Sequence, residues 1–257
     1  MTKPAGAPRH RVGLLTGCVQ SVFFSGVNAA TARVLAAEGC EVVAPQRQGC
    51  CGALSVHAGR DAEAQAYARA LIETFEAESV DFIVVNAAGC GAAMKAYGRL
   101  LGNDPAFAAR ASAFEGKVRD FSQFLHDVGP IARRHRLAGR VTYHDACHLQ
   151  HGQRVHATPR TLLRSIPGLE LCDSAEPDIC CGSAGVFNLL QTEPARELGE
   201  RKARHLLATG ADVVATSNPG CMLQIRASLA RQGAHTPVLH VAEVLAASLD
   251  GADRAVR

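Results

Sequence analysis

Short apolar runs recur along the chain, and loops or helical patterns separate them. The runs that predict strands are 12–15, 41–44, 82–85 and 117–121, followed by 141–143, 169–172, 213–215 and 237–241. They are nearly continuous in apolar residues, as expected of parallel strands that are buried on both faces. Helical spacing of Ala, Leu, Ile and Phe is clearest over residues 62–78 and 194–207. The alternation of strands and helices predicts an α/β protein.

The cysteines divide this pattern into two tandem repeats. Four cysteines of the first half each have a counterpart in the second half, at an offset of 129 residues for the first, 130 for the adjacent pair and 131 for the last. The matched sets are Cys18, Cys50, Cys51 and Cys90, then Cys147, Cys180, Cys181 and Cys221. We therefore expect two domains, residues 1–135 and 136–257, each with a parallel sheet of about four strands flanked by helices. The basic stretch 133–140 is interpreted as the joint between them.

Every repeated cysteine follows a predicted strand. In open α/β sheets ligands bind beyond the carboxyl ends of the strands, so four thiols should gather there in each half. Helices expected to begin just after Cys90 and Cys221 would direct their positive ends at these thiols and favour thiolates. We interpret the two sets as soft-metal sites with all eight repeated cysteines as ligands.

The spacing favours an iron-sulfur site over zinc. Structural zinc sites usually take cysteines from close C-x2-C pairs, whereas the only close pair here is adjacent. Adjacent side chains diverge and do not readily bind one tetrahedral ion, but a cluster offers each of them a separate iron atom. Zinc and packed free thiols stay open as alternatives.

Composition narrows the remaining classes. The 27 Lys and Arg against 24 Asp and Glu leave a net charge of only +3, and aromatic residues are few, so a nucleic-acid partner is not expected. The chain has no apolar run of the roughly 18 residues that a membrane span needs. The opening residues lack an apolar signal-peptide core, so we expect a cytoplasmic protein. In that compartment ten cysteines indicate metal or redox chemistry rather than disulfides.

Several other residues receive structural interpretations. His144, Asp145 and His148 flank Cys147, and hydrogen bonding that orders the loop is favoured over a ligand or proton-relay role. Cys40 and Cys172 lie outside the repeat and are interpreted as small buried apolar residues. The chain contains no nucleophile motif, P-loop or dinucleotide fingerprint, so no catalytic residue is assigned.

The two cysteine blocks resemble the cysteine-rich CCG domain. This domain occurs in the cysteine-rich subunit of heterodisulfide reductase, in lactate-utilisation iron-sulfur proteins and in glycolate oxidase iron-sulfur subunits. The local sequence is most similar to the last group in six segments, TGCVQSVFF (16–24), GCCGALSVHAGR (49–60), AAGCGAAMKAYG (87–98), HDACHLQHGQ (144–153), DICCGSAG (178–185) and NPGC (218–221). The resemblance covers nearly the whole chain, from about residue 11 to residue 248.

This resemblance implies an electron-transfer subunit of a glycolate, or related 2-hydroxy acid, dehydrogenase. It implies a 4Fe-4S cluster and flavin only on partner subunits that oxidise glycolate to glyoxylate. We expect the chain to be inactive alone and peripheral to the inner membrane through its complex. A thiol-disulfide enzyme of the heterodisulfide reductase kind and a zinc-stabilised assembly module without redox function are the alternatives.

Two departures from the family pattern bear on these expectations. Members with the strongest cluster pattern end each block in C-x-x-C, whereas Ala93 and Gln224 stand at the second cysteine position here. An ordinary four-iron cluster and an incomplete one both stay open. Complete glycolate oxidase iron-sulfur subunits also carry C-x2-C-x2-C-x3-C-P runs. This chain has none, so we expect a separate ferredoxin-like partner chain.

Overall fold

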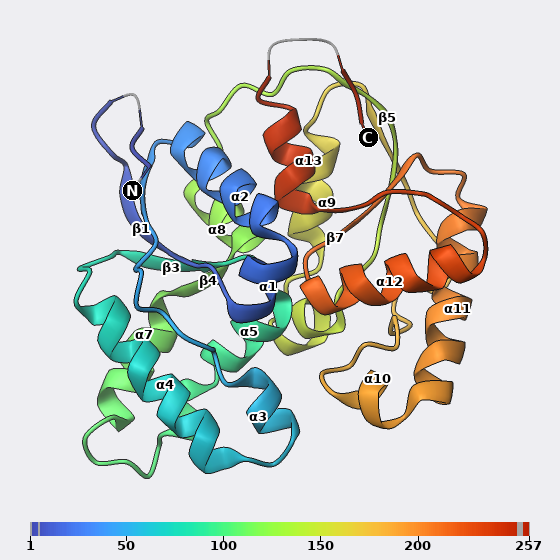
Figure 1. The fold of residues 1–257 in the computed structure, drawn as a ribbon. Helices are drawn as coiled ribbons and strands as arrows, with labels where there is room; N and C mark the ends of the chain where they lie inside the picture. The colour runs from blue at the N-terminus through green and yellow to red at the C-terminus, as the bar shows by residue number, and fades with distance from the viewer. Residues whose placement is uncertain (1, 5, 251–253, 257) are drawn as a thin grey trace. The chain divides into compact units, whose positions relative to one another are not determined.

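The computed structural model describes residues 2–4, 6–250 and 254–256. The chain divides into two compact units, residues 1–131 and 132–257, each built on its own parallel sheet (Figure 1). We call them the first and second units.

The first unit has a four-stranded sheet in the order β2-β1-β3-β4. Its strands are β1 (His10–Leu15), β2 (Cys40–Val43), β3 (Phe82–Val85) and β4 (Val118–Asp120). All three pairings are parallel, so the four carboxyl ends lie at one edge. The two central strands are largely buried, β1 from Val12 and β3 from Ile83 onward, as expected of strands that are covered on both sides.

The second unit repeats this topology in the order β6-β5-β7-β8. Its strands are β5 (Leu137–Tyr143), β6 (Leu169–Cys172), β7 (Val213–Thr216) and β8 (Val238–His240), and a short β9 (Arg254–Ala255) pairs with the start of β5. These pairings are also parallel. In both sheets the strand that opens the unit occupies an interior position, which matches a duplicated architecture.

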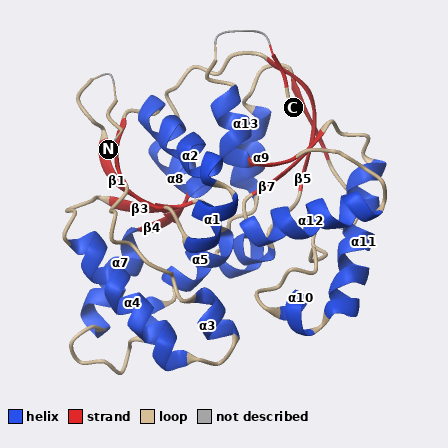
Figure 2. Ribbon diagram, in the orientation of Figure 1, coloured by secondary structure: helices blue, strands red, loops and turns tan. Residues whose placement is uncertain are grey.

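Helices flank both sheets (Figure 2). In the first unit they are α1 (Cys18–Phe23), α2 (Ser25–Ala37), α3 (Ala53–His57), α4 (Asp61–Glu76), α5 (Ala88–Met94), α6 (Tyr97–Leu100), α7 (Ala108–Lys117) and α8 (Phe121–Val128). In the second unit they are the π-helical turn η1 (His148–Gly152), α9 (Ala157–Arg164), α10 (Phe187–Leu190), α11 (Thr192–Ala208), α12 (Pro219–Arg231) and α13 (Val241–Ala247).

Helix α4 shows how the sequence places a helix on its sheet. Its buried residues recur at spacings of three and four, so they form one apolar stripe. They are Ala64, Ala68, Leu71, Ile72 and Phe75. The stripe joins Leu15 of β1 and Ile83 of β3 in the core of the first unit. The loops that follow these strands are therefore held on a packed base.

The α/β fold with two tandem repeats is confirmed, and the differences from expectation are local. Helices α5 and α12 begin before Cys90 and Cys221, which are therefore the third residues of their helices rather than residues ahead of them. The stretch 133–140 is not wholly a joint, because β5 already begins at the buried residue Leu137. Pairing with β9, which the sequence analysis did not predict, extends β5 at its start.

The glycine after each cysteine pair has a positive φ, +75° at Gly52 and +89° at Gly182. A Cβ at Gly52 would lie 3.1 Å from the carbonyl oxygen of Ala64, a tight contact. A Cβ at Gly182 would overlap the carbonyl oxygen of Ala195, which belongs to helix backbone and has little freedom to move. Both turns thus need glycine, and the second needs it more strongly.

We expect Gly182→Ala to destabilise the protein more than Gly52→Ala does. The positive φ alone costs about 1 kcal/mol in either variant, and the overlap at Gly182 adds about 1–3 kcal/mol of overpacking. Urea denaturation of the two metal-free variants, followed by circular dichroism, measures the difference. Equal losses in the free energy of unfolding would contradict this assignment of the two turns.

Candidate metal centres

The first unit brings its four cysteines to the carboxyl edge of its sheet. Cys18 is the first residue of α1 after β1, Cys50 and Cys51 follow β2, and Cys90 lies in α5 after β3. The Sγ atoms of Cys18 and Cys50 are 3.8 Å apart. The amide of Gly52 donates a hydrogen bond to Cys50 Sγ at 3.3 Å, so the turn itself presents this sulfur.

The second unit places its cysteines in equivalent positions. Cys147 precedes the turn η1, Cys180 and Cys181 follow β6, and Cys221 lies in the first turn of α12. The amide after the pair again donates to the first sulfur, from Gly182 to Cys180 at 3.3 Å. The repeated amide-to-sulfur bond shows that the two turns have the same construction.

Neighbouring thiols interact within each set. In the first unit Cys18 interacts with Cys50, Cys50 with Cys51, and Cys51 with Cys90. The second unit has the same chain of contacts, from Cys147 through Cys180 and Cys181 to Cys221. The four thiols of a set therefore lie in an unbroken series, although they come from three loops.

The two sets differ in charge preference. In the first unit the hydrogen bond with Cys50, followed by burial, raises the pKa of Cys18. In the second unit hydrogen bonds from Cys147 and Cys181 lower the pKa of Cys180. Within the second set the pKa of Cys221 is also lowered, whereas the pKa values of Cys147 and Cys181 are raised. Two of its four thiols thus favour the thiolate form, which is the form that binds metals.

One compact donor group stands out in the described part of the chain. The ligand atoms of His144, Cys181 and Cys221 all lie within 4.8 Å of one another, and all three residues are buried. The side-chain amide of Asn218 donates to Cys221 Sγ at 3.5 Å. The sequence analysis gave His144 a role in ordering the loop, so it missed the position of this ring beside two sulfurs. Its place directly after the apolar run 141–143 was the available signal.

The two cysteines outside the repeat lie elsewhere in the fold. Cys40 is fully buried at the start of β2, as expected of a small apolar residue. Cys172 was expected to be buried as well, but it is partly exposed, and its Sγ lies 3.7 Å from a carboxylate oxygen of Glu170. Both cysteines lie on edge strands, but every residue of β6 is at least partly exposed, whereas β2 is mostly buried.

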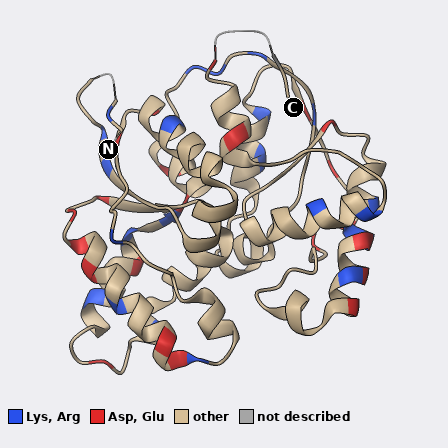
Figure 3. Cartoon of the chain, in the orientation of Figure 1, with Lys and Arg blue, Asp and Glu red and all other residues tan. Residues whose placement is uncertain are grey.

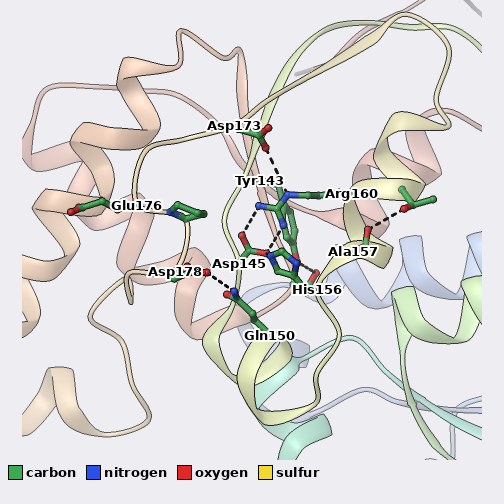
Figure 4. Close-up of polar contacts among 12 residues, drawn as sticks. Tyr143, Asp145, Gln150, His156, Ala157, Arg160, Asp173, Glu176 and Asp178 are labelled. Carbon is green, nitrogen blue, oxygen red and sulfur yellow. Dashed lines mark hydrogen bonds and ion pairs between the residues drawn. The ribbon is translucent and has the colours of Figure 1, made fainter.

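A buried ion pair holds the loop between β5 and Cys147. Arg160 on α9 donates two parallel hydrogen bonds to Asp145, one of them 2.6 Å from Nη2 to Oδ2 (Figure 4). The guanidinium also lies over the ring of Tyr143, 5.0 Å from its centroid. The side chain of Asp145 is only 2% exposed, so this carboxylate is occupied by Arg160. A bidentate pair of this kind fixes geometry as well as charge.

A buried lysine holds the loop ahead of the second cysteine pair. Lys202 on α11 is fully buried and donates from Nζ to the carbonyl oxygens of Glu176 at 2.7 Å and Pro177 at 3.2 Å. Burial lowers the pKa of its ammonium. The chain between β6 and Cys180 is therefore anchored to α11 by its backbone.

The short helices at the cysteine edges carry no Asp, Glu, Lys or Arg. These are α1, α3 and α5 in the first unit and α10 in the second, whereas α4 and α11 carry many charged residues (Figure 3). Large apolar side chains are exposed here, including Phe23 at 62% and Leu189 at 74%. The exposed apolar residues are Val22, Phe23, Leu54 and Val56 in the first unit, and Leu189 and Leu190 in the second. We call these groups the first and second edge patches.

The donor sets fit a thiophilic metal centre. Each unit offers four thiols in a connected series, all ten cysteines are free, and the buried carboxylate of Asp145 is already paired. Sulfur donors select zinc, copper(I) or iron-sulfur centres over hard cations such as Mg²⁺. Within residues 2–4, 6–250 and 254–256, no helix has the length and apolar character to span a membrane.

Both units match the family model of the CCG cysteine-rich domain, over residues 12–95 and 141–226. The chain belongs to this family. It is similar to a probable glycolate oxidase iron-sulfur subunit of Bacillus subtilis, with 37% identity over 247 residues. That match covers 93% of this chain and 55% of the relative, so the chain spans about half the length of this protein.

Two further comparisons bear on length and fold. Lactate utilization protein A of Shouchella clausii is 32% identical over 240 residues, covering 91% of this chain and 98% of that protein. A crystal structure of a hypothetical protein from Helicobacter pylori superposes with a TM-score of 0.66 at 10% identity, covering 98% of this chain and 52% of that one. The structural likeness supports the fold alone.

We expect Arg160→Met to lower the free energy of unfolding by about 3–5 kcal/mol, because it leaves the Asp145 carboxylate buried without its partner. Arg201→Met is the matched control, since it breaks an exposed pair with Glu176 and should cost about 0.2–1 kcal/mol. Denaturation of both variants beside the parent tests the difference. A small, equal loss in the two variants would show that the Asp145 pair does not hold the loop.

Proposed function

We propose that this chain is the iron-sulfur electron-transfer subunit of a flavin-dependent dehydrogenase that oxidises glycolate or a related 2-hydroxy acid. The observation that carries the proposal is the pair of repeated thiol series, each at the carboxyl edge of its own sheet. The relatives named as a probable glycolate oxidase iron-sulfur subunit and lactate utilization protein A support the same class of reaction. Glycolate is the substrate we favour, because the more similar of these two relatives carries that name.

Two centres would be held in this chain. Cys18, Cys50, Cys51 and Cys90 are the proposed ligands of the first, and Cys147, Cys180, Cys181 and Cys221 those of the second. An iron-sulfur cluster, for which we propose the 4Fe-4S type, supplies one-electron transfer when bound. The chain itself would present the thiolates. Cys51 and Cys181 are buried away from solvent, and the main-chain amides of Gly52 and Gly182 hold the sulfurs of Cys50 and Cys180 in place.

The hydride of a 2-hydroxy acid would be accepted by flavin on a partner subunit. The edge patches are the proposed docking surfaces for the flavin-bearing subunit and a ferredoxin-like chain, because exposed apolar side chains there lie on the same helices and loops as the cysteines. Assembly at these surfaces would bring redox centres close together and cover the exposed sulfur of Cys18. We also propose a cytoplasmic location, with attachment to the inner membrane through the complex.

The metal content tests this function first. Protein purified without oxygen should contain iron and acid-labile sulfide and give an electron paramagnetic resonance signal on reduction. Cys51→Ser and Cys181→Ser should each remove roughly half of the iron, because each unit holds one centre. Cys172→Ser, which changes a cysteine outside the repeat, should retain all of it. Zinc without sulfide would instead support an assembly module, and metal-free protein that reduces disulfides would support a thiol-disulfide enzyme.

Electron delivery tests the partner. Glycolate should reduce the centres only when a flavin-bearing dehydrogenase subunit is added, and the chain alone should give no turnover with an artificial dye. Turnover by the flavin-free chain alone would overturn its assignment as an accessory subunit.

We expect Phe23→Lys to slow electron delivery from the partner at least tenfold, because it places a charge in the first edge patch. Ile131→Lys is the matched control. Ile131 is equally exposed, at 62%, but its amide donates to Glu38, which lies before β2 at the opposite edge of the sheet. Stopped-flow reduction of both variants at equal iron content measures the effect. Equal rates in the two variants would remove the patch from the docking surface.

A further inference from the structure

The ring of His144 is buried beside the second set of thiols but does not have the hydrogen bonds that usually hold a buried histidine. The residue is 1% exposed, and its main-chain amide donates to Ala215 at 2.8 Å, which continues the pairing of β5 with β7. Among the described residues neither ring nitrogen has a hydrogen bond of good geometry, and the ring lies against the thiol of Cys221. Buried polar groups are nearly always paired, and a metal held by this thiol would supply the partner that the imidazole lacks.

The ring lies at ligand distance from two sulfurs. The ligand atoms of His144, Cys181 and Cys221 are within 4.8 Å of one another. Bond lengths of about 2.0–2.3 Å place two donors on one tetrahedral metal roughly 3.5–3.8 Å apart. Small side-chain adjustments would close this gap, and donors on neighbouring iron atoms of a cluster need not approach so closely. The three side chains thus already face a common centre.

The surrounding loop holds the ring in this position before any metal binds. Asp145, the next residue, is fixed by its two hydrogen bonds from Arg160, and Tyr143, the preceding residue, lies under the same guanidinium (Figure 4). Because Asp145 is already paired, its carboxylate does not compete with the imidazole. A ligand that is held in place loses little conformational entropy when the metal arrives.

The repeat shows that this donor belongs to the second unit alone. Cys147 corresponds to Cys18 at an offset of 129 residues, which places Leu15 at the position equivalent to His144. Leu15 is 1% exposed and packs in the hydrophobic core of the first unit. An apolar side chain satisfies that core position, so the imidazole is not required by the fold.

We propose that His144 is a ligand of the metal centre held by Cys147, Cys180, Cys181 and Cys221. The second centre then has a mixed nitrogen and sulfur donor set, whereas the first has thiolates only. This inference rests on the proposed iron-sulfur function. An imidazole ligand is neutral, whereas a thiolate is anionic and lowers the reduction potential of an iron-sulfur centre. His144 therefore adds a donor to the second centre without adding negative charge.

The experiment uses the full chain, purified without oxygen, with Cys51→Ser introduced to silence the first centre. Reduced protein labelled with ¹⁵N-histidine is examined by electron-nuclear double resonance. The parent should show a strongly coupled histidine nitrogen, and His144→Leu, the residue of the first unit, should lose it. The matched control is His151→Leu, an exposed histidine on η1, and it should retain the coupling.

A second variant covers the possibility that His144→Leu fails to fold. His144→Cys keeps a metal ligand at the position, so it should retain iron, lose the nitrogen coupling and lower the reduction potential of the second centre. Two outcomes would overturn the ligand assignment while leaving the proposed function intact, each in protein that contains iron and sulfide. One is only weak nitrogen coupling in the parent, and the other is coupling that persists in His144→Cys.

The opposite failure is also distinguishable. Zinc without sulfide in the purified chain would overturn the proposed function. The ligand assignment is then read from protein loaded with Co²⁺, in which the same histidine coupling should be present in the parent and absent in His144→Leu. Its absence from the parent would overturn the ligand assignment as well.

Discussion

The parallel pairing of one central strand with two neighbours is the constraint on which both sites depend. Because β1 pairs in parallel with β2 and β3, three loops that are distant in sequence must leave the sheet at the same edge. The same holds for β5 with β6 and β7. In each unit the second of the three loops carries two adjacent cysteines, so three loops are enough to bring four sulfurs together. An antiparallel arrangement would send at least one of these loops to the opposite edge.

Much of this arrangement could be predicted from the sequence, because buried parallel strands and repeated cysteines leave strong local signals. The run 82–85 coincides with β3, and 169–172 with β6. The missed features depend on tertiary contacts. The first turns of α5 and α12 begin ahead of Cys90 and Cys221. No capping residue marks the start of α5, whereas Asn218 at the N-cap and Pro219 in the first turn did mark the start of α12. The exposure of Cys172 follows the partial exposure of the whole strand β6, which periodicity does not reveal.

The position of the His144 ring beside two sulfurs, which the sequence analysis did not predict, has a physical explanation. Beside Cys147 in sequence, a histidine with Asp145 next to it suggests hydrogen bonding within the loop. In the structure the carboxylate turns to Arg160, and the ring turns to Cys221. The sequence of one loop could not show this division, because Arg160 comes from α9 and Cys221 from α12. Comparison of the two repeats, which places Leu15 opposite His144, was the stronger guide.

The uncharged helices at the cysteine edges also affect how these sites respond to a change in their own charge. Helices α1, α3, α5 and α10 present backbone dipoles and apolar side chains to their surroundings, with no ionised side chain of their own to swing or to exchange counterions. Fixed dipoles need not reorient when a charge arrives or leaves. Such surroundings lower the reorganisation energy of a redox centre. A cluster held here, as we propose, would then exchange electrons at a rate governed mainly by distance and driving force.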